Sequence, residues 1–65
     1  MVDGVHISHA DQLACVRREL RMRETAYPRW VANGKMTQQK ANLELLHMAA
    51  VVATLERLAA TERLL

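Results

Sequence analysis

The residues with the greatest potential for chemistry lie in the segment Arg21 to Lys35, RMRETAYPRWVANGK, which holds the only Trp and the only Tyr of the chain. On a helix with about 100° per residue, Arg23 and Trp30 lie about 40° and 60° from Tyr27, on the same side. Flat aromatic rings beside arginines suit a nucleobase and its phosphate. We therefore expect a ligand-binding ledge, formed by Arg23, Tyr27, Arg29, Trp30 and Lys35.

A purely structural explanation of the same residues stays open. Glu19 precedes Arg23 by four positions, which allows an ion pair along one helix face. Trp30 would then stack over the Arg23 guanidinium. In that interpretation these side chains brace the helix and bind nothing.

No other constellation predicts chemistry. His6 and His9, with Cys15 downstream, straddle an N-terminal arm and the start of a helix, so we expect no metal site. Cys15 belongs to a strip of small and apolar residues, which favours packing. Catalytic triads, Cys–His pairs, paired carboxylates with a plausible pocket and Gly-rich phosphate loops are missing from the pattern. We expect a protein without catalytic activity and without a cofactor.

A helix over about 9–32 must position the ledge. Ser8 is a good N-cap, and apolar residues follow at spacings of 3, 4, 7 and 4. These residues are Leu13, Val16, Leu20, Tyr27 and Val31. Pro28 lies inside the run and disfavours a regular helix. Either the helix ends near Ala26, or it continues with a kink near Pro28, and the unbroken phase favours the kink.

A second helix is expected over about 38–63, after a turn at 33–36. Asn33-Gly34 is a helix stop, and Thr37 is a natural N-cap. An apolar seam with alternating spacings of 4 and 3 then needs the first helix as its partner. The seam consists of Ala41, Leu45, Met48, Val52, Leu55 and Ala59. Because the connection is short, the two helices must be antiparallel neighbours.

A further stripe on the second helix predicts self-association. One antiparallel partner cannot cover both the seam and this stripe, so we assign the stripe to a subunit interface. It consists of Leu46, Ala49, Ala50, Ala53 and Ala60. A chain of 65 residues with one cysteine has no disulfide of its own to supplement a small core. The expected fold is all-α: a flexible arm at 1–7 and a helical hairpin at 8–65, assembling into a homo-oligomeric helical bundle.

The net charge of +2 hides an asymmetry. Residues 15–40 carry seven basic and two acidic side chains, whereas residues 41–65 carry two and three. Such a basic half indicates an anionic partner or, equally, a solvated arginine face. A run of about 18 apolar residues, as a membrane span requires, is missing. The lone thiol and the lack of a signal-peptide pattern lead us to expect a cytoplasmic protein.

Part of the chain is similar to a known family. Tyr27-Pro28-Arg29-Trp30-Val31 is followed by Gly34-Lys35-Met36, and then by Gln38, Ala41, Glu44 and Met48. Over about 16–55 the chain resembles a family of short helical proteins encoded by tailed bacteriophages and prophages. The resemblance implies a bacteriophage setting and, during infection, a host bacterial cytoplasm. Small helical phage proteins of this size are often accessory factors. Small phage proteins of this kind include inhibitors of host proteins and oligomers that sequester the nucleotide signals of antiphage defence.

Together these features lead us to expect an oligomeric binding protein that counters host defence by sequestering a small nucleotide signal, cyclic or otherwise. Two alternatives stay open. One is a nucleic-acid-binding regulator that uses the polar first turn of the second helix, at Gln38, Gln39, Lys40 and Asn42. The other is an inhibitor that binds a host protein through a helical interface.

Overall fold

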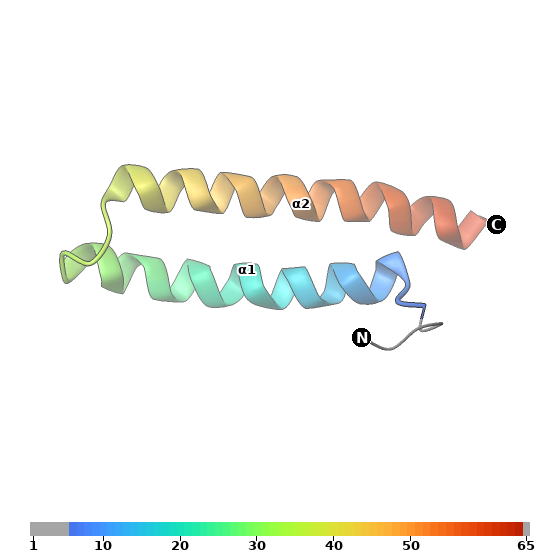
Figure 1. Ribbon diagram of the computed structural model, residues 1–65, viewed down its shortest axis with the longest axis horizontal. Coiled ribbons are helices and arrows are strands. Elements are labelled where there is room, and N and C mark those ends of the chain that lie inside the picture. The colour runs from blue at the N-terminus through green and yellow to red at the C-terminus, as the bar shows by residue number, and fades with distance from the viewer. Residues whose placement is uncertain (1–5, 65) are drawn as a thin grey trace.

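The computed structural model describes residues 6–64, which form two antiparallel helices side by side (Figure 1). Helix α1 spans His9–Ala32 and helix α2 spans Gln38–Leu64. A short connection at 33–37 joins them, and the described part of the chain contains no strand. The prediction of an all-helical two-helix hairpin is thus confirmed. Most of the predicted flexible arm, residues 1–5, lies outside the described residues.

The starts of both helices are set by hydroxyl caps, as the sequence predicts. The Ser8 Oγ accepts a hydrogen bond from the Asp11 N–H at 3.0 Å, and the Thr37 Oγ1 accepts one from the Lys40 N–H at 3.0 Å. Each cap satisfies an amide that has no partner within its own helix. Hydroxyl capping therefore fixes where both helices begin.

The end of α1 depends on Gly34, whose φ of +74° lies in the left-handed region that side chains with a Cβ rarely adopt. This conformation turns the chain back on itself. The Lys35 N–H then donates to the Trp30 carbonyl at 2.8 Å, and the Gly34 N–H donates to the Val31 carbonyl at 3.1 Å. The turn consumes carbonyls that would otherwise be unpaired at the helix end.

Helix α1 continues through Pro28 to Ala32 as a single element. The alternative in which it ends near Ala26 is therefore wrong. A kink at Pro28 stays a prediction. Proline has no N–H to donate to the carbonyl four residues back, here that of Glu24, and its ring crowds that carbonyl. The side chain of Pro28 is exposed, so it contributes little packing in return.

We therefore expect Pro28→Ala to stabilise the helix. The substitution restores one backbone hydrogen bond and relieves the ring clash, and we expect a gain of about 1–3 kcal/mol in the free energy of unfolding. Urea titrations of the two proteins at equal concentration, followed by circular dichroism, measure the difference. A loss of stability in Pro28→Ala would show that the proline geometry itself supports the packing of α1.

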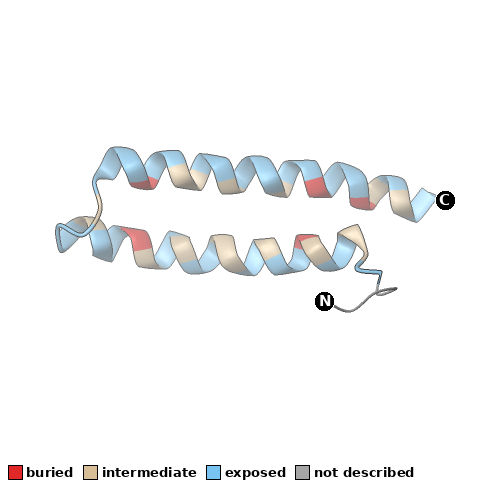
Figure 2. Cartoon of the chain, in the orientation of Figure 1, coloured by how far each residue is buried: buried red, intermediate tan, exposed pale blue. Residues whose placement is uncertain are grey.

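The core is a narrow line where the two helices face each other (Figure 2). Its buried members are Leu13, Tyr27, Ala41, Leu55 and Ala59. The other members of the predicted α2 seam are half-buried. The seam on α2 is thus confirmed as the side that contacts α1. Two of the five buried side chains are alanines, so the core is small even for a chain of this length.

Glu62 ties the end of α2 to the start of α1. Its Oε1 accepts a hydrogen bond from the His9 backbone N–H at 3.0 Å, and its Oε2 contacts the His9 imidazole at Nδ1. A carboxylate suits this place because the first amides of a helix are unpaired and carry partial positive charge. A second bridge, Arg17 Nη2 to Glu56 Oε2 at 2.6 Å, also joins the helices but lies exposed to solvent.

These two bridges are expected to differ in their contribution to stability. Glu62→Ala should lower the free energy of unfolding by about 1 kcal/mol, because it leaves a helix-start amide without a partner. Glu56→Ala is the matched control, and its exposed ion pair should contribute less than about 0.5 kcal/mol. Chemical denaturation of both variants at one protein concentration makes the comparison. Equal losses would contradict the assigned role of Glu62.

Neither α1 nor α2, within the described residues, holds a stretch long and apolar enough to cross a membrane.

Candidate functional site

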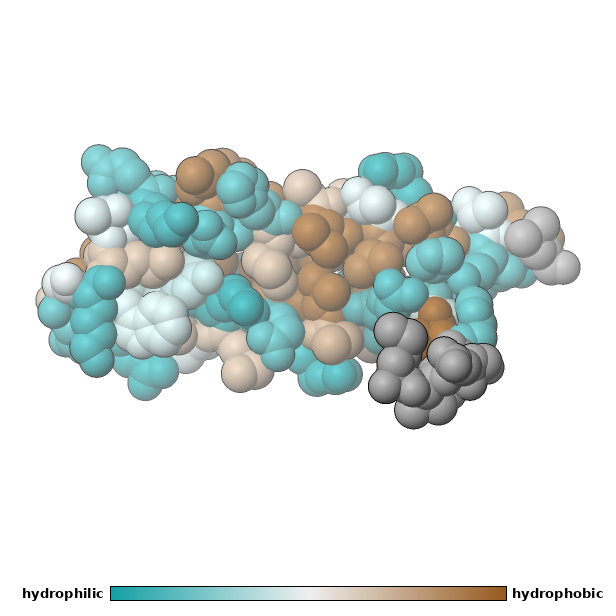
Figure 3. Space-filling view, viewed as in Figure 1, coloured by the Kyte–Doolittle hydropathy of each residue, from teal (hydrophilic) through white to brown (hydrophobic). Residues whose placement is uncertain are grey.

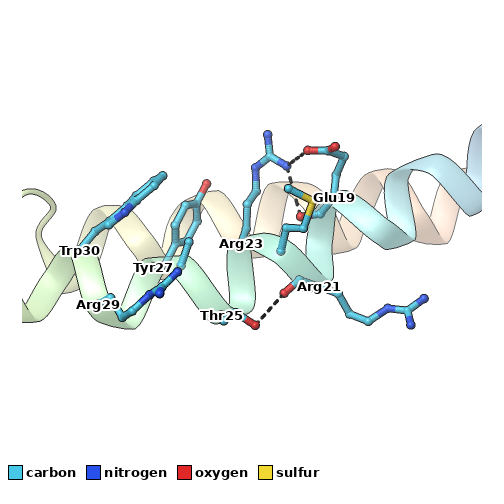
Figure 4. Close-up of a pocket in the computed structure, with 9 residues that line it drawn as sticks. Glu19, Arg21, Arg23, Thr25, Tyr27, Arg29 and Trp30 are labelled. Atoms are coloured by element: carbon cyan, nitrogen blue, oxygen red, sulfur yellow. Dashed lines mark hydrogen bonds and ion pairs between the residues drawn. The ribbon is translucent and has the colours of Figure 1, made fainter.

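A shallow depression of about 700 Å³ lies on the solvent side of α1, and all of its lining residues come from that helix. Its lining combines two aromatic rings with arginines and small or apolar side chains (Figure 4). Four of the five predicted ligand-binding residues line it: Arg23, Tyr27, Arg29 and Trp30. We call this surface the α1 ledge. The expectation that these four side chains share one surface therefore agrees with their positions.

The two aromatic residues of the ledge have different environments. Tyr27 is a core residue with 6% of its surface exposed, whereas Trp30 is 42% exposed. Their ring centroids lie 5.5 Å apart at a tilt of 41°, a geometry typical of favourable aromatic pairs. Tyr27 thus anchors the indole from behind. Trp30 is the ring that is free to stack on another molecule.

Arg23 is engaged by a neighbour on its own helix. Its Nη1 donates to Glu19 Oε2 at 2.7 Å and to the Glu19 carbonyl at 3.2 Å. The Glu19 carboxylate, with a smaller contribution from Tyr27, raises the pKa of Arg23 above its ordinary value. The Glu19–Arg23 pairing of the structural explanation is therefore confirmed. Trp30 packs on Tyr27 instead of over the guanidinium, and Tyr27 stands between the two in Figure 4.

Arg21 and Arg29 supply further positive charge to the ledge. Four ion pairs are found among residues 6–64, and neither of these two arginines takes part in one. Arg21 extends along α1 away from the aromatic rings (Figure 4). Around the depression, three arginines thus stand against one acidic side chain, that of Glu19. Because Arg23 is paired with Glu19, the net positive charge comes from Arg21 and Arg29.

Lys35 does not line the depression. It follows the left-handed turn at Gly34, where its backbone N–H closes the end of α1 on Trp30. This helix-ending turn sets the position of Lys35. The sequence predicted the turn, but we did not infer from it that Lys35 would lie outside the depression. Whether its ammonium reaches a bound ligand stays a prediction.

The sequence prediction did not count four residues that line the ledge: Arg21, Met22, Thr25 and Ala26. Met22 is 63% exposed and precedes Ala26 and Trp30 in steps of four, so the three share one side of α1. That spacing is visible in the sequence. It marks an apolar floor for the ledge, beside which the arginines lie.

The other candidate positions form no site among the described residues. No group of three or more His, Cys, Asp or Glu that could hold a metal ion is found in residues 6–64. His9, the more structured of the two N-terminal histidines, contacts Glu62 instead. The absence of catalysis and of a cofactor stays an expectation.

The predicted interface stripe of α2 is not covered by α1. Leu46 is 66% exposed, Ala49, Ala50 and Ala53 are exposed, and Ala60 is half-buried. This agrees with the argument that one antiparallel partner cannot cover both the seam and the stripe. The use of the stripe by another subunit stays a prediction.

Comparison of the chain with protein-family models, with curated proteins and with solved structures finds no match. The resemblance to the bacteriophage family therefore stays a hypothesis that rests on the motif residues alone.

The unequal burial of the two rings predicts a division of roles. Tyr27→Ala should lower the free energy of unfolding by about 3–5 kcal/mol, because it empties part of the small core. Trp30→Ala should cost about 1 kcal/mol, the contribution of one exposed aromatic pair. Thermal melts by circular dichroism compare the two variants. Similar losses would mean that Trp30 braces the hairpin as much as Tyr27 does.

Proposed function

We propose that this protein is a binding protein without catalytic activity, and that its α1 ledge holds an anionic planar ligand of the nucleotide class. The observation that carries the proposal is the exposed Trp30 ring, backed by Tyr27 in a depression that three arginines also line. An aromatic platform and guanidinium groups recognise the two parts of a nucleotide, its base and its phosphate. Acid–base or nucleophilic chemistry is not needed for that task.

Each part of the ledge has a role in the proposal. Trp30 stacks on the base, which contributes about 1–3 kcal/mol. Arg29 meets the phosphate with charge-assisted hydrogen bonds, worth about 1.5–3 kcal/mol each. Arg23 can donate to the phosphate only when it leaves Glu19, which accepts a hydrogen bond from its guanidinium in the free protein. A ligand phosphate would have to compete with that carboxylate.

The biological setting that we propose follows from the family resemblance. A bacteriophage protein of this kind would act in the host bacterial cytoplasm and would sequester a small nucleotide signal of host defence. The basic character of α1 supports an anionic ligand. We further propose that the protein acts as a homo-oligomer, because apolar side chains of α2 such as Leu46 and Val51 stay exposed in the single hairpin.

Calorimetric titration with cyclic and linear nucleotides tests the proposal. We expect micromolar or tighter binding of at least one nucleotide, and Trp30→Ala and Arg29→Ala should each weaken it by roughly ten- to a hundredfold. Arg18→Ala is the matched control: Arg18 is exposed and points about 180° away from Tyr27 around α1, so binding should hardly change.

Glu19→Gln provides an opposite prediction. The substitution releases Arg23 and makes the ledge more positive by one charge, so the same nucleotide should bind several-fold more tightly.

Equal loss of binding in Arg18→Ala and Arg29→Ala would argue against a discrete site. Preference for duplex DNA, with a steep loss of affinity as salt rises, would favour the nucleic-acid alternative.

A further inference from the structure

We propose that a second copy of this chain docks on a groove between α1 and α2, which Cys15 of α1 and Val51 of α2 help to line. The groove has a volume of about 620 Å³ and lies toward the N-terminal end of α1, away from the α1 ledge. Its walls are mostly apolar and include Ile7, Cys15 and Val16 from the α1 side and Val51 and Leu55 from α2. We call it the Cys15–Val51 groove. The inference is independent of the proposed nucleotide binding.

The hairpin is a single layer of two helices (Figure 1). Its two helices lie side by side, and each buries one side against the other (Figure 1). Stable domains pack at least two layers around a core. A second hairpin laid on the first would supply that missing layer, so the occupant that the shape calls for is another helical pair.

The accessible surface of one chain is large for its mass. The chain exposes 5186 Å², whereas a compact protein of 7.4 kDa exposes about 4200 Å². The excess of about 1000 Å² is close to the roughly 800 Å² that each partner buries in a stable protein–protein interface. One hairpin therefore has enough accessible surface to bury that area against a single second copy.

The exposed apolar side chains indicate on which face of the hairpin the second copy docks. Hydrophobic side chains gather across both helices in the middle of the face that Figure 3 shows. Ile7 is 52% exposed and Val51 44% exposed, although both line the groove. On the opposite face, the Arg17–Glu56 ion pair crosses between the helices. Residues 49 and 51 point about 160° apart, which places Ala49 and Val51 on different faces of the layer.

The charge of a surface also decides whether it can face a copy of itself. A two-fold interface brings the same surface of each copy together, so like charges on that surface would repel. Among the described residues that line the Cys15–Val51 groove, Asp11 is the one charged side chain. The α1 ledge, with its three arginines, could not face a copy of itself in this way. The groove can, because its described lining carries a single charge.

The groove differs from the alanine stripe that the sequence suggested. Ala50 belongs to both surfaces, whereas Val51 belongs to the groove alone and Ala53 to the stripe alone. Both Val51 and Ala53 are exposed positions of α2, two residues apart. The pair therefore provides matched substitutions that tell the two surfaces apart.

Light scattering and cross-linking test the inference. The unmodified protein at 100 µM should have about twice the 7.4 kDa chain mass. In a Cys15→Ser background, Val51→Cys should form a covalent dimer with a short bismaleimide, and Ala53→Cys should not. Val51→Glu should weaken self-association by roughly a hundredfold or more, whereas Ala53→Glu should leave the dimer intact. The cysteine variants add no charge, so they remain informative if Val51→Glu fails to fold.

The native thiol offers an independent readout. Cys15 is exposed in the single chain, so docking should cover it, and a thiol reagent should label it at least ten times more slowly at 100 µM than at 1 µM protein. A monomer at 100 µM overturns the inference, whether its thiol reacts quickly or is covered by the same chain. Cross-linking through position 53 instead of position 51 also overturns it and assigns the interface to the alanine stripe.

Discussion

Helix α2 carries apolar side chains on every side, and a hairpin offers only one neighbouring helix to cover them. Between residues 45 and 53, His47 is the only polar side chain. A helix that is apolar all round is normally buried on all sides. Here α1 covers the seam, of which Ala41, Leu55 and Ala59 are buried. Leu46 and Val51 stay exposed on either side of it. The narrow core, the single-layer shape and the proposed self-association all follow from this mismatch.

The ledge depends on the same core. Tyr27 is buried against α2, and because it lies three residues before Trp30 on α1, it holds the indole at the helix surface. The turn at Gly34 then closes the helix on the Trp30 carbonyl. Tyr27 therefore positions the Trp30 ring, and the hydrogen bond from Lys35 fixes the backbone that carries it. A platform held in this way loses little freedom when a ligand stacks on it, which favours binding.

Much of the fold could be predicted because its determinants are local. Ser8, Thr37 and the Asn33-Gly34 stop set the helix bounds through hydrogen bonds within a few residues, and the α2 seam follows from helical spacing. The ledge was harder to predict: the apolar spacing placed Tyr27 on the core side of α1, but it did not show that burial of Tyr27 would leave Trp30 as the exposed ring of the pair. The pairing of Arg23 with Glu19 was visible in the spacing, but the packing of Trp30 on Tyr27 instead of over the guanidinium was not.

The central claim is that one hairpin is only part of the folded unit. The most direct measurement is the melting temperature of the unmodified protein, followed by circular dichroism, at concentrations from 1 to 200 µM. If folding is coupled to self-association, the melting temperature must rise with concentration, because mass action stabilises the assembled state. We expect a steady increase across this range, together with loss of helicity at the lowest concentrations. A melting temperature that is independent of concentration, with full helicity at 1 µM, would show that the single hairpin is stable alone and would contradict the account.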